Sequence, residues 1–137
     1  MCGIVGYVGA RPVREQLLAG LEKLEYRGYD SAGISVLNGD AIDSVRAVGN
    51  LDALRGALAA EPARSDPTHP VTSVALAEPG TGIGHTRWAT HGRVTESNAH
   101  PHFDTADRVH VVVNGIVENY VSLKRRLQDM GAIFTSE

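Results

Sequence analysis

Cysteine is nearly absent from this chain, which contains only Cys2, directly after the first methionine. One cysteine excludes a disulfide within the chain and any zinc site built from several cysteine ligands. It also fits a reducing compartment, because proteins of oxidising compartments usually carry paired cysteines. We therefore expect a cytoplasmic protein.

Long apolar runs and blocks of basic charge are also missing. No stretch approaches the ~20 apolar residues of a membrane span, and no basic segment followed by an apolar run indicates a signal peptide. The net charge is −3, from 13 basic and 16 acidic residues, without an arginine-rich stripe. We expect neither a nucleic-acid nor a membrane partner. The 137 residues, 42% of them hydrophobic, suffice for one domain with a single core.

Helix and strand patterns are interspersed along the chain, which predicts a mixed α and β class. Apolar side chains recur at helical spacing in three segments, residues 12–24 with Gly28 as a stop, 50–58 with Asn50 as a cap, and 119–130. Strands are expected at residues 2–8 (buried), 32–37, 41–48, 82–86, 109–113 and from 133, with a brief one at 71–77 inside a proline-rich loop. The Asn38-Gly39-Asp40 turn predicts a hairpin. Because the last strand stops within a few residues, we expect a C-terminally truncated domain.

The position of Cys2 indicates a nucleophile. Loss of Met1 would leave a first residue that carries both a thiol and a free α-amine. The amine titrates near pH ~7.7–8.0 and the thiol near ~8.5, so the amine can accept the thiol proton at neutral pH. The alternative is a strand cysteine that packs as a small hydrophobe. The other motifs favour the nucleophile.

A cysteine that attacks a carboxamide needs hydrogen-bond donors where negative charge develops on the amide oxygen. Asn114 offers a side-chain N–H and Gly115 an unobstructed backbone N–H, both at the end of a predicted strand. The alternative is an ordinary Asn-Gly turn.

An amino-acid substrate also needs a partner for its α-carboxylate. Arg87 can bind a carboxylate through two parallel hydrogen bonds, and Trp88 could cover the ligand. Thr90 and Gly92 add short polar contacts and close backbone approach. The alternative is a surface arginine beside a core tryptophan.

Four histidines, His85, His91, His100 and His102, raise the question of a metal site. Acidic residues do not cluster near them, and their spacing matches no known zinc motif. We expect no metal, and roles in hydrogen bonding and loop packing.

Five segments together resemble one family. In order they are residues 1–6, 25–33, 85–92, 98–102 and 114–119. They are similar to the glutaminase domain of the glutamine–fructose-6-phosphate aminotransferases. The opening Cys-Gly-Ile fits any class II glutamine amidotransferase. The string His-Thr-Arg-Trp-Ala-Thr-His-Gly is more specific, because it reads differently in phosphoribosylpyrophosphate amidotransferases and asparagine synthetases. Residues 1–137 would be part of the glutaminase domain, without the sugar isomerase domains.

The resemblance implies an α+β fold, the N-terminal nucleophile (Ntn) hydrolase αββα sandwich. It implies that Cys2, exposed by removal of Met1, attacks the glutamine side-chain amide with its own α-amine as base. Asn114 and Gly115 would form the oxyanion hole. Ammonia would leave, and water would hydrolyse the γ-glutamyl thioester.

The resemblance also implies how glutamine is bound. Arg87 matches the ligand of the glutamine carboxylate in a mobile loop, and Trp88 matches the gating tryptophan of that loop. Thr90 and His91 match its other glutamine-contacting positions, and Arg27 matches a supporting position near the nucleophile. In the complete enzyme, ammonia would aminate fructose-6-phosphate in the absent domain to give glucosamine-6-phosphate. No cofactor is implied, and the complete enzyme would be a homo-oligomer.

Two departures from the family pattern leave alternatives open. Val113 stands where the family commonly has histidine. After Glu137 the family continues with Thr-Asp-Thr-Glu, whose aspartate binds the glutamine α-amine. Without that aspartate, the chain could be a catalytically incomplete fragment. Because the acceptor domain is absent too, it could also belong to a class II amidotransferase with another acceptor, against which only the string 85–92 argues.

Overall fold

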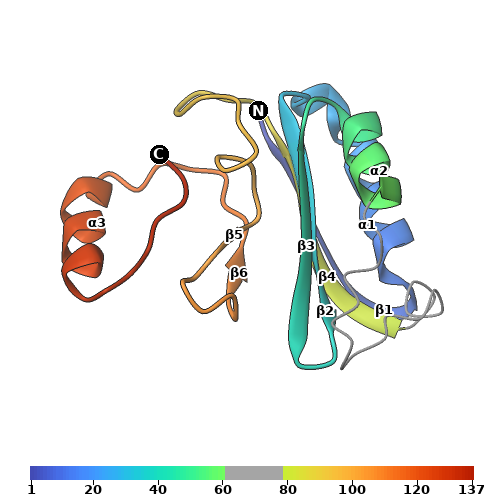
Figure 1. The fold of residues 1–137 in the computed structure, drawn as a ribbon. Coiled ribbons are helices and arrows are strands. Elements are labelled where there is room, and N and C mark those ends of the chain that lie inside the picture. The colour runs from blue at the N-terminus through green and yellow to red at the C-terminus, as the bar shows by residue number, and fades with distance from the viewer. Residues whose placement is uncertain (61–78) are drawn as a thin grey trace.

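The computed structural model describes residues 1–60 and 79–137. Its centre is a four-stranded antiparallel sheet in the order β1-β4-β2-β3, formed by Gly3–Pro12, Pro79–Arg87, Ser31–Asn38 and Ala41–Val48. Helices α1 (Val13–Glu22) and α2 (Leu51–Ala60) cover one face (Figure 1). Strands β5 (His102–Phe103) and β6 (His110–Val111) form a small ribbon against the other face, and α3 (Tyr120–Asp129) lies apart from the sheet.

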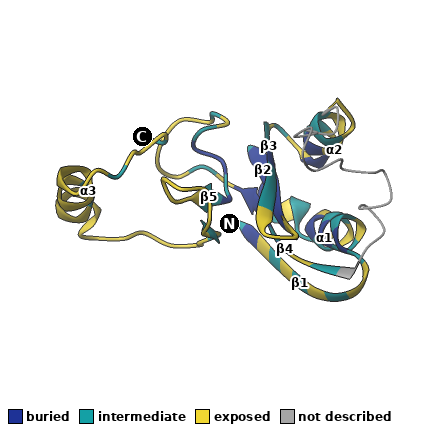
Figure 2. Ribbon diagram, turned by 60° about the horizontal axis from the view of Figure 1, so that its bottom comes forward, coloured by how far each residue is buried: buried dark blue, intermediate teal, exposed yellow. Residues whose placement is uncertain are grey.

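The core lies between the sheet and the two helices. Alternate residues of β2 point toward the helices, so Ile34 is buried among Leu17 and Leu21 of α1 and Leu54 of α2. Figure 2 shows this buried layer, with the outer helix surfaces exposed. The apolar residues at helical spacing in both helices therefore face the core, as the sequence predicted.

We expect Leu17→Ala to lower the free energy of unfolding by about 2–5 kcal/mol, because it removes a side chain that is wholly buried and leaves a cavity. Urea denaturation followed by circular dichroism measures the change. Leu18→Ala, one position along the helix and only partly buried, is the matched control. Equal losses for the two variants would contradict this placement of the core.

The first strand is confirmed, but the prediction that it is buried is wrong. Within the described residues, β1 pairs only with β4 and is therefore an edge strand. Val5 and Tyr7 pack against the core, whereas Ile4 and Val8 point to the other face and are exposed. The alternation follows from the two-residue period of a strand with helices on one side only.

The predicted local signals at the hairpin and at two helix starts are confirmed. Asn38 pairs with Ala41, and Gly39 adopts a φ of +59°, which suits a residue without Cβ. Helix α1 starts directly after Pro12. At α2, the side-chain oxygen of Asn50 accepts a hydrogen bond from the Ala53 N–H at 3.3 Å.

Helix α1 ends earlier than predicted. Its last residue is Glu22, and a separate 3₁₀ turn, η1 (Glu25–Arg27), follows and ends before Gly28. The apolar Leu24 belongs to this connection rather than to the helix.

The ribbon is joined to the sheet by polar and aromatic contacts. Ser35 Oγ of β2 lies 2.8 Å from His110 Nδ1 of β6. The Arg46 guanidinium of β3 stacks over the Phe103 ring of β5 at 5.0 Å. A Cβ on Gly33 would overlap the carbonyl oxygen of His100, so the chain before β5 lies directly on the sheet.

Two predictions in the C-terminal third are wrong. Only His110 and Val111 of the predicted strand 109–113 form a ladder. Their partner in the described part is β5, which is equally short. Residues 133–134 form no strand. Helix α3 matches its predicted span, but none of its side chains is buried. The predicted strand at 71–77 lies outside the described residues.

In the two described ranges, the helices are too short and too polar to traverse a lipid bilayer.

Candidate functional site

Pairing of β1 with β4 brings Cys2 to the loop that follows Arg87. Gly3 lies opposite Thr86, so Cys2 reaches the end of β4. The Trp88 backbone N–H donates a hydrogen bond to Cys2 Sγ at 3.3 Å, and Sγ lies 3.6 Å from the Trp88 carbonyl oxygen. The thiol is partly exposed, so a ligand could reach it.

The side chain of Asn114 also contacts Cys2. Its Nδ2 donates to the Cys2 carbonyl oxygen at 3.2 Å, although 112 residues separate the two. Gly115 follows in the same exposed segment, where an added Cβ would contact only Val113 Cγ1, at 3.9 Å. The structure thus brings Cys2 and Asn114 together, and Gly115 is the next residue along the chain.

His85 contacts the side-chain oxygen of Asn114. Its Nε2 is 2.8 Å from Asn114 Oδ1, and the residue is 1% exposed. Burial lowers the pKa of His85, and the charge of Arg87 adds to this, while the hydrogen bond to Asn114 opposes it. The sequence predicted hydrogen bonding for His85 but not its connection to Asn114, because the contact spans 29 residues.

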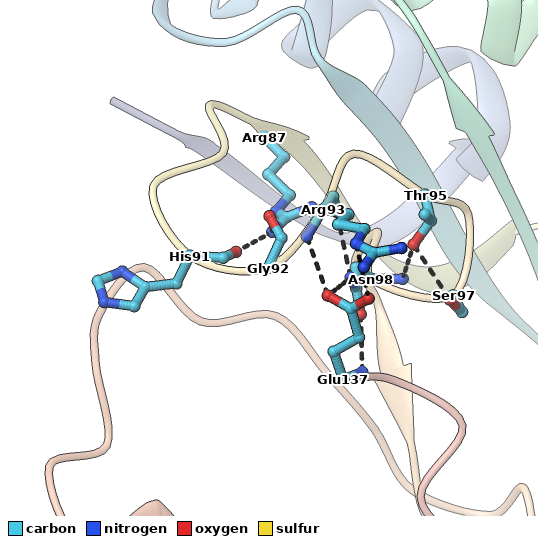
Figure 3. A network of polar contacts seen from close by, with 8 residues as sticks. All are labelled: Arg87, His91, Gly92, Arg93, Thr95, Ser97, Asn98 and Glu137. Atoms are coloured by element: carbon cyan, nitrogen blue, oxygen red, sulfur yellow. Dashed lines mark hydrogen bonds and ion pairs between the residues drawn. The ribbon is translucent and has the colours of Figure 1, made fainter.

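Arg87 is buried, so the alternative of a surface arginine is wrong. Its guanidinium donates to the carbonyl oxygens of His91, Gly92 at 3.5 Å and Arg93 at 3.0 Å (Figure 3). These bonds hold the loop that follows β4. The guanidinium has five N–H donors, and the loop carbonyls take three of them.

Trp88, Thr90 and His91 all lie on the exposed surface of this loop. Trp88 is 43% exposed, so it is not a core tryptophan. Its ring packs edge-on against Tyr29, with 5.4 Å between ring centroids. The His91 ring points away from the Arg87 guanidinium (Figure 3).

The segment after η1 is hydrogen-bonded to the loop that follows β4. The Ala89 N–H donates to Asp30 Oδ2 at 2.8 Å, and the Asp30 N–H donates to the Arg87 carbonyl oxygen at 3.0 Å. A Cβ on Gly28 would come within 2.7–2.9 Å of the Arg87 and Trp88 backbone, so a glycine is needed there. Arg27 lies at the N-terminus, with Nη2 3.6 Å from Met1 Sδ.

A second polar network holds the far end of the loop. Asn98 Nδ2 donates to the Arg93 carbonyl oxygen at 3.1 Å, and Asn98 Oδ1 accepts from the Glu137 N–H at 2.9 Å. The Glu137 carboxylate accepts from the Arg93 N–H at 3.1 Å, which lowers its pKa (Figure 3). No local pattern marked Asn98 and Glu137 as parts of one network, since 39 residues separate them.

Three histidine rings of the site contact one another: His85 stacks on His100, and His102 meets His100 edge-on. Ring centroids of His85 and His100 lie 4.3 Å apart, as do those of His100 and His102. Burial, followed by the charges of neighbouring histidines and Arg87, lowers the pKa of His100 to about 3. Among the described residues, no group of three potential ligands is placed to hold a metal ion.

We expect the stability of the fold to fall as the pH drops from about 6.5 toward 3. His100, with its lowered pKa, stays neutral in the folded state, whereas the unfolded chain takes up a proton below about pH 6.5. His85 and His102 act in the same direction. Urea midpoints at pH 7 and pH 4.5 test this, and His100→Gln should weaken the dependence. An unchanged dependence in that variant would contradict the assignment.

Comparison with known proteins shows extensive sequence similarity to one kind of enzyme. Over its whole length the chain is 51% identical to glutamine–fructose-6-phosphate aminotransferase of Tropheryma whipplei and of Thermosynechococcus vestitus. It is 48% identical to the enzyme of the same name from Bradyrhizobium diazoefficiens. In each case the chain spans 20% of the length of the relative. No family profile matches the chain.

Two solved structures share the fold. One is glutamine phosphoribosylpyrophosphate amidotransferase of Bacillus subtilis, with a TM-score of 0.68, and the other is described as the allosteric regulatory enzyme of purine biosynthesis, with a TM-score of 0.71. Each is 23% identical and covers 98% of this chain, which spans 26% of the solved chain. The predicted α+β class and Ntn fold are confirmed. The chain has the fold of the Ntn glutamine amidotransferases and is related, over its full length, to the N-terminal region of the glutamine–fructose-6-phosphate aminotransferases.

Proposed function

We propose that this chain supplies the glutamine-hydrolysing site of an enzyme that makes glucosamine-6-phosphate from glutamine and fructose-6-phosphate. The observation that carries the proposal is the meeting of Cys2 with Asn114 and Trp88 at the end of β4. The sequence similarity to aminotransferases of that name supports the acceptor.

The nucleophile of the proposed reaction is Cys2 Sγ. After removal of Met1, the α-amine of Cys2 takes the thiol proton while sulfur bonds to the amide carbon of glutamine. The resulting oxyanion accepts hydrogen bonds from Asn114 Nδ2 and the Gly115 N–H. The amine returns the proton to the leaving nitrogen, ammonia departs, and water hydrolyses the thioester to glutamate.

The loop after β4 binds the amino-acid end of the substrate in this proposal. Three of the five Arg87 donors hold loop carbonyls, which leaves Nε–H and one Nη1–H for the glutamine carboxylate rather than a parallel pair on one edge. Trp88, Thr90 and His91 contribute contacts from the exposed surface of the loop. Arg27, whose Nη2 lies 3.6 Å from Met1 Sδ before that residue is removed, is assigned a supporting position near the nucleophile.

Fructose-6-phosphate would bind outside residues 1–137, which correspond to part of the glutaminase domain. The relatives support this division, because the chain spans only 20% of their length. The complete enzyme is proposed to be a cytoplasmic homo-oligomer. The resemblance behind these proposals implies no cofactor.

Intact mass spectrometry after treatment with the glutamine analogue 6-diazo-5-oxo-norleucine tests the proposed site. The product of the complete reading frame should lack Met1 and gain one adduct, on Cys2. A retained Met1 together with an unmodified Cys2 would overturn the proposal. An assay for glucosamine-6-phosphate then separates this enzyme from an amidotransferase with another acceptor.

A further inference from the structure

We propose that His85 is a positioning residue that orients the side-chain amide of Asn114 toward the reacting centre. The inference rests on the proposed glutamine hydrolysis, in which Asn114 Nδ2 stabilises the oxyanion. It goes further because it assigns a role to a side chain that acts through Asn114 rather than on the nucleophile or the substrate.

The amide of Asn114 is held at both ends. Its oxygen lies 2.8 Å from His85 Nε2, and its nitrogen donates to the Cys2 carbonyl oxygen at 3.2 Å. Asn114 is itself exposed, in a segment without a ladder partner in the described part of the chain. These two hydrogen bonds therefore decide how its side chain lies.

The direction of the amide follows from donor and acceptor chemistry. A carbonyl oxygen only accepts, so Nε2 of His85 must carry the hydrogen. If the amide turned by 180°, its nitrogen would face the Nε2–H and its oxygen would face the Cys2 carbonyl. Both contacts would then be repulsive. The Nε2–H of His85 and the Cys2 carbonyl thus together select the orientation that places Nδ2 beside Cys2.

The surroundings of His85 maintain this donor. The ring belongs to the central strand β4, lies opposite Gly33 of β2 and stacks on His100. Its Nδ1 is buried and has no partner among the described residues, which fits the neutral ring with hydrogen on Nε2. Burial and the nearby charge of Arg87 lower the pKa of His85, so the ring stays neutral around pH 7.

Two substitutions at this position separate hydrogen bonding from packing. His85→Leu fills the site with an apolar side chain of similar bulk and removes the donor, whereas His85→Gln can present an amide N–H close to the position of Nε2. In the product of the complete reading frame, His85→Leu should lower kcat for glutamine hydrolysis by about 10- to 100-fold. KM for glutamine should stay within about twofold, because Asn114 acts on charge that develops only in the transition state. His85→Gln should recover most of the lost rate.

Alkylation of Cys2 by iodoacetamide distinguishes positioning from collapse of the site. This displacement forms a carbon–sulfur bond and releases iodide without building an oxyanion, so its rate should be the same in His85→Leu as in the unsubstituted protein. His102→Leu is the matched control, since His102 packs edge-on against His100 in the same histidine cluster, and no hydrogen bond joins it to Asn114 in the described residues. Its kcat should be nearly unchanged.

Three kinetic results for the His85 variants would overturn the inference. They are an unchanged kcat in His85→Leu, equal losses in His85→Gln and His85→Leu, and a fall in alkylation rate that parallels the fall in kcat. A loss in His102→Leu as large as that in His85→Leu would also overturn it.

A measurement without turnover separates this inference from the proposed function. Nitrogen-15 NMR of ring-labelled histidine should show the His85 ring neutral at pH 7, with hydrogen on Nε2. A ring with hydrogen on Nδ1 would overturn the inference even in an active enzyme. An unsubstituted protein that hydrolyses no glutamine would overturn the proposed function, while the NMR result would still decide whether His85 donates to Asn114.

Discussion

Replacing Cys2 with alanine is expected to lower glutamine hydrolysis by the complete gene product by about 10⁴-fold or more, because no other group can form the thioester. Cys2 is the only cysteine in the chain, so no second thiol of these residues can substitute for it. The substitution should leave the fold intact, since the thiol is only partly buried. Ammonia release from glutamine measures the rate, and circular dichroism checks the fold.

An uncleavable N-terminal extension tests the role of the α-amine separately from that of the thiol. It keeps the Cys2 side chain but moves the free amine away from it, so hydrolysis should fall strongly while iodoacetamide still alkylates the thiol. A tagged protein with the rate of the untagged one would contradict the amine as base. Full activity in Cys2→Ala would contradict the nucleophile itself.

Replacing Asn114 with alanine is expected to lower kcat by about 10²- to 10³-fold, or ~2.7–4 kcal/mol in transition-state free energy, with little change in KM. The physical reason is the loss of a donor that lies beside Cys2 and meets charge only as the tetrahedral intermediate forms. Steady-state kinetics with glutamine give the two constants separately.

Asn114→Asp sharpens this test, because it keeps the shape of the side chain while replacing the donor with a carboxylate oxygen. Its kcat should fall at least as far as that of the alanine variant, since the new charge repels the oxyanion. Val113→Ala, at the exposed neighbouring residue, should stay near the unsubstituted rate. A near-normal kcat in Asn114→Asp would exclude Asn114 from the oxyanion hole.

Much of the candidate site was predictable because each group reveals its chemistry in isolation. Cys2 is recognisable from its place beside the N-terminus, Arg87 from its forked guanidinium, and Asn114 from the Asn-Gly pair after a β-branched run. The same holds for helices α1 and α2, whose apolar period and local caps lie within a few residues. The catalytic roles of Cys2, Arg87 and Asn114 remain predictions, whereas the contact between Cys2 and Asn114 near the end of β4 is a property of the fold.

The supporting residues could not be predicted, because each acts through a partner that is distant in the chain. Asp30 binds the Ala89 backbone across 59 residues, and Asn98 binds Glu137 across 39. Hydrogen bonds of this kind depend on strand order, which no local pattern contains. The strand predicted at 109–113 was too long for the same reason, since a strand forms only where another backbone pairs with it.

The sequence by itself therefore determined the reactive groups and the local structure. These are a thiol at the second residue, adjacent arginine and tryptophan residues in a loop, a hairpin at Asn38 and helices with one apolar face. The arrangement of these parts came from the fold. Antiparallel pairing of β1 with β4 places Cys2 on the Trp88 backbone, and the buried ring of His85 orients Asn114 from behind. The reason is physical, because side-chain periodicity and caps act within a few residues, whereas the order of strands in a sheet depends on the packing of the whole core.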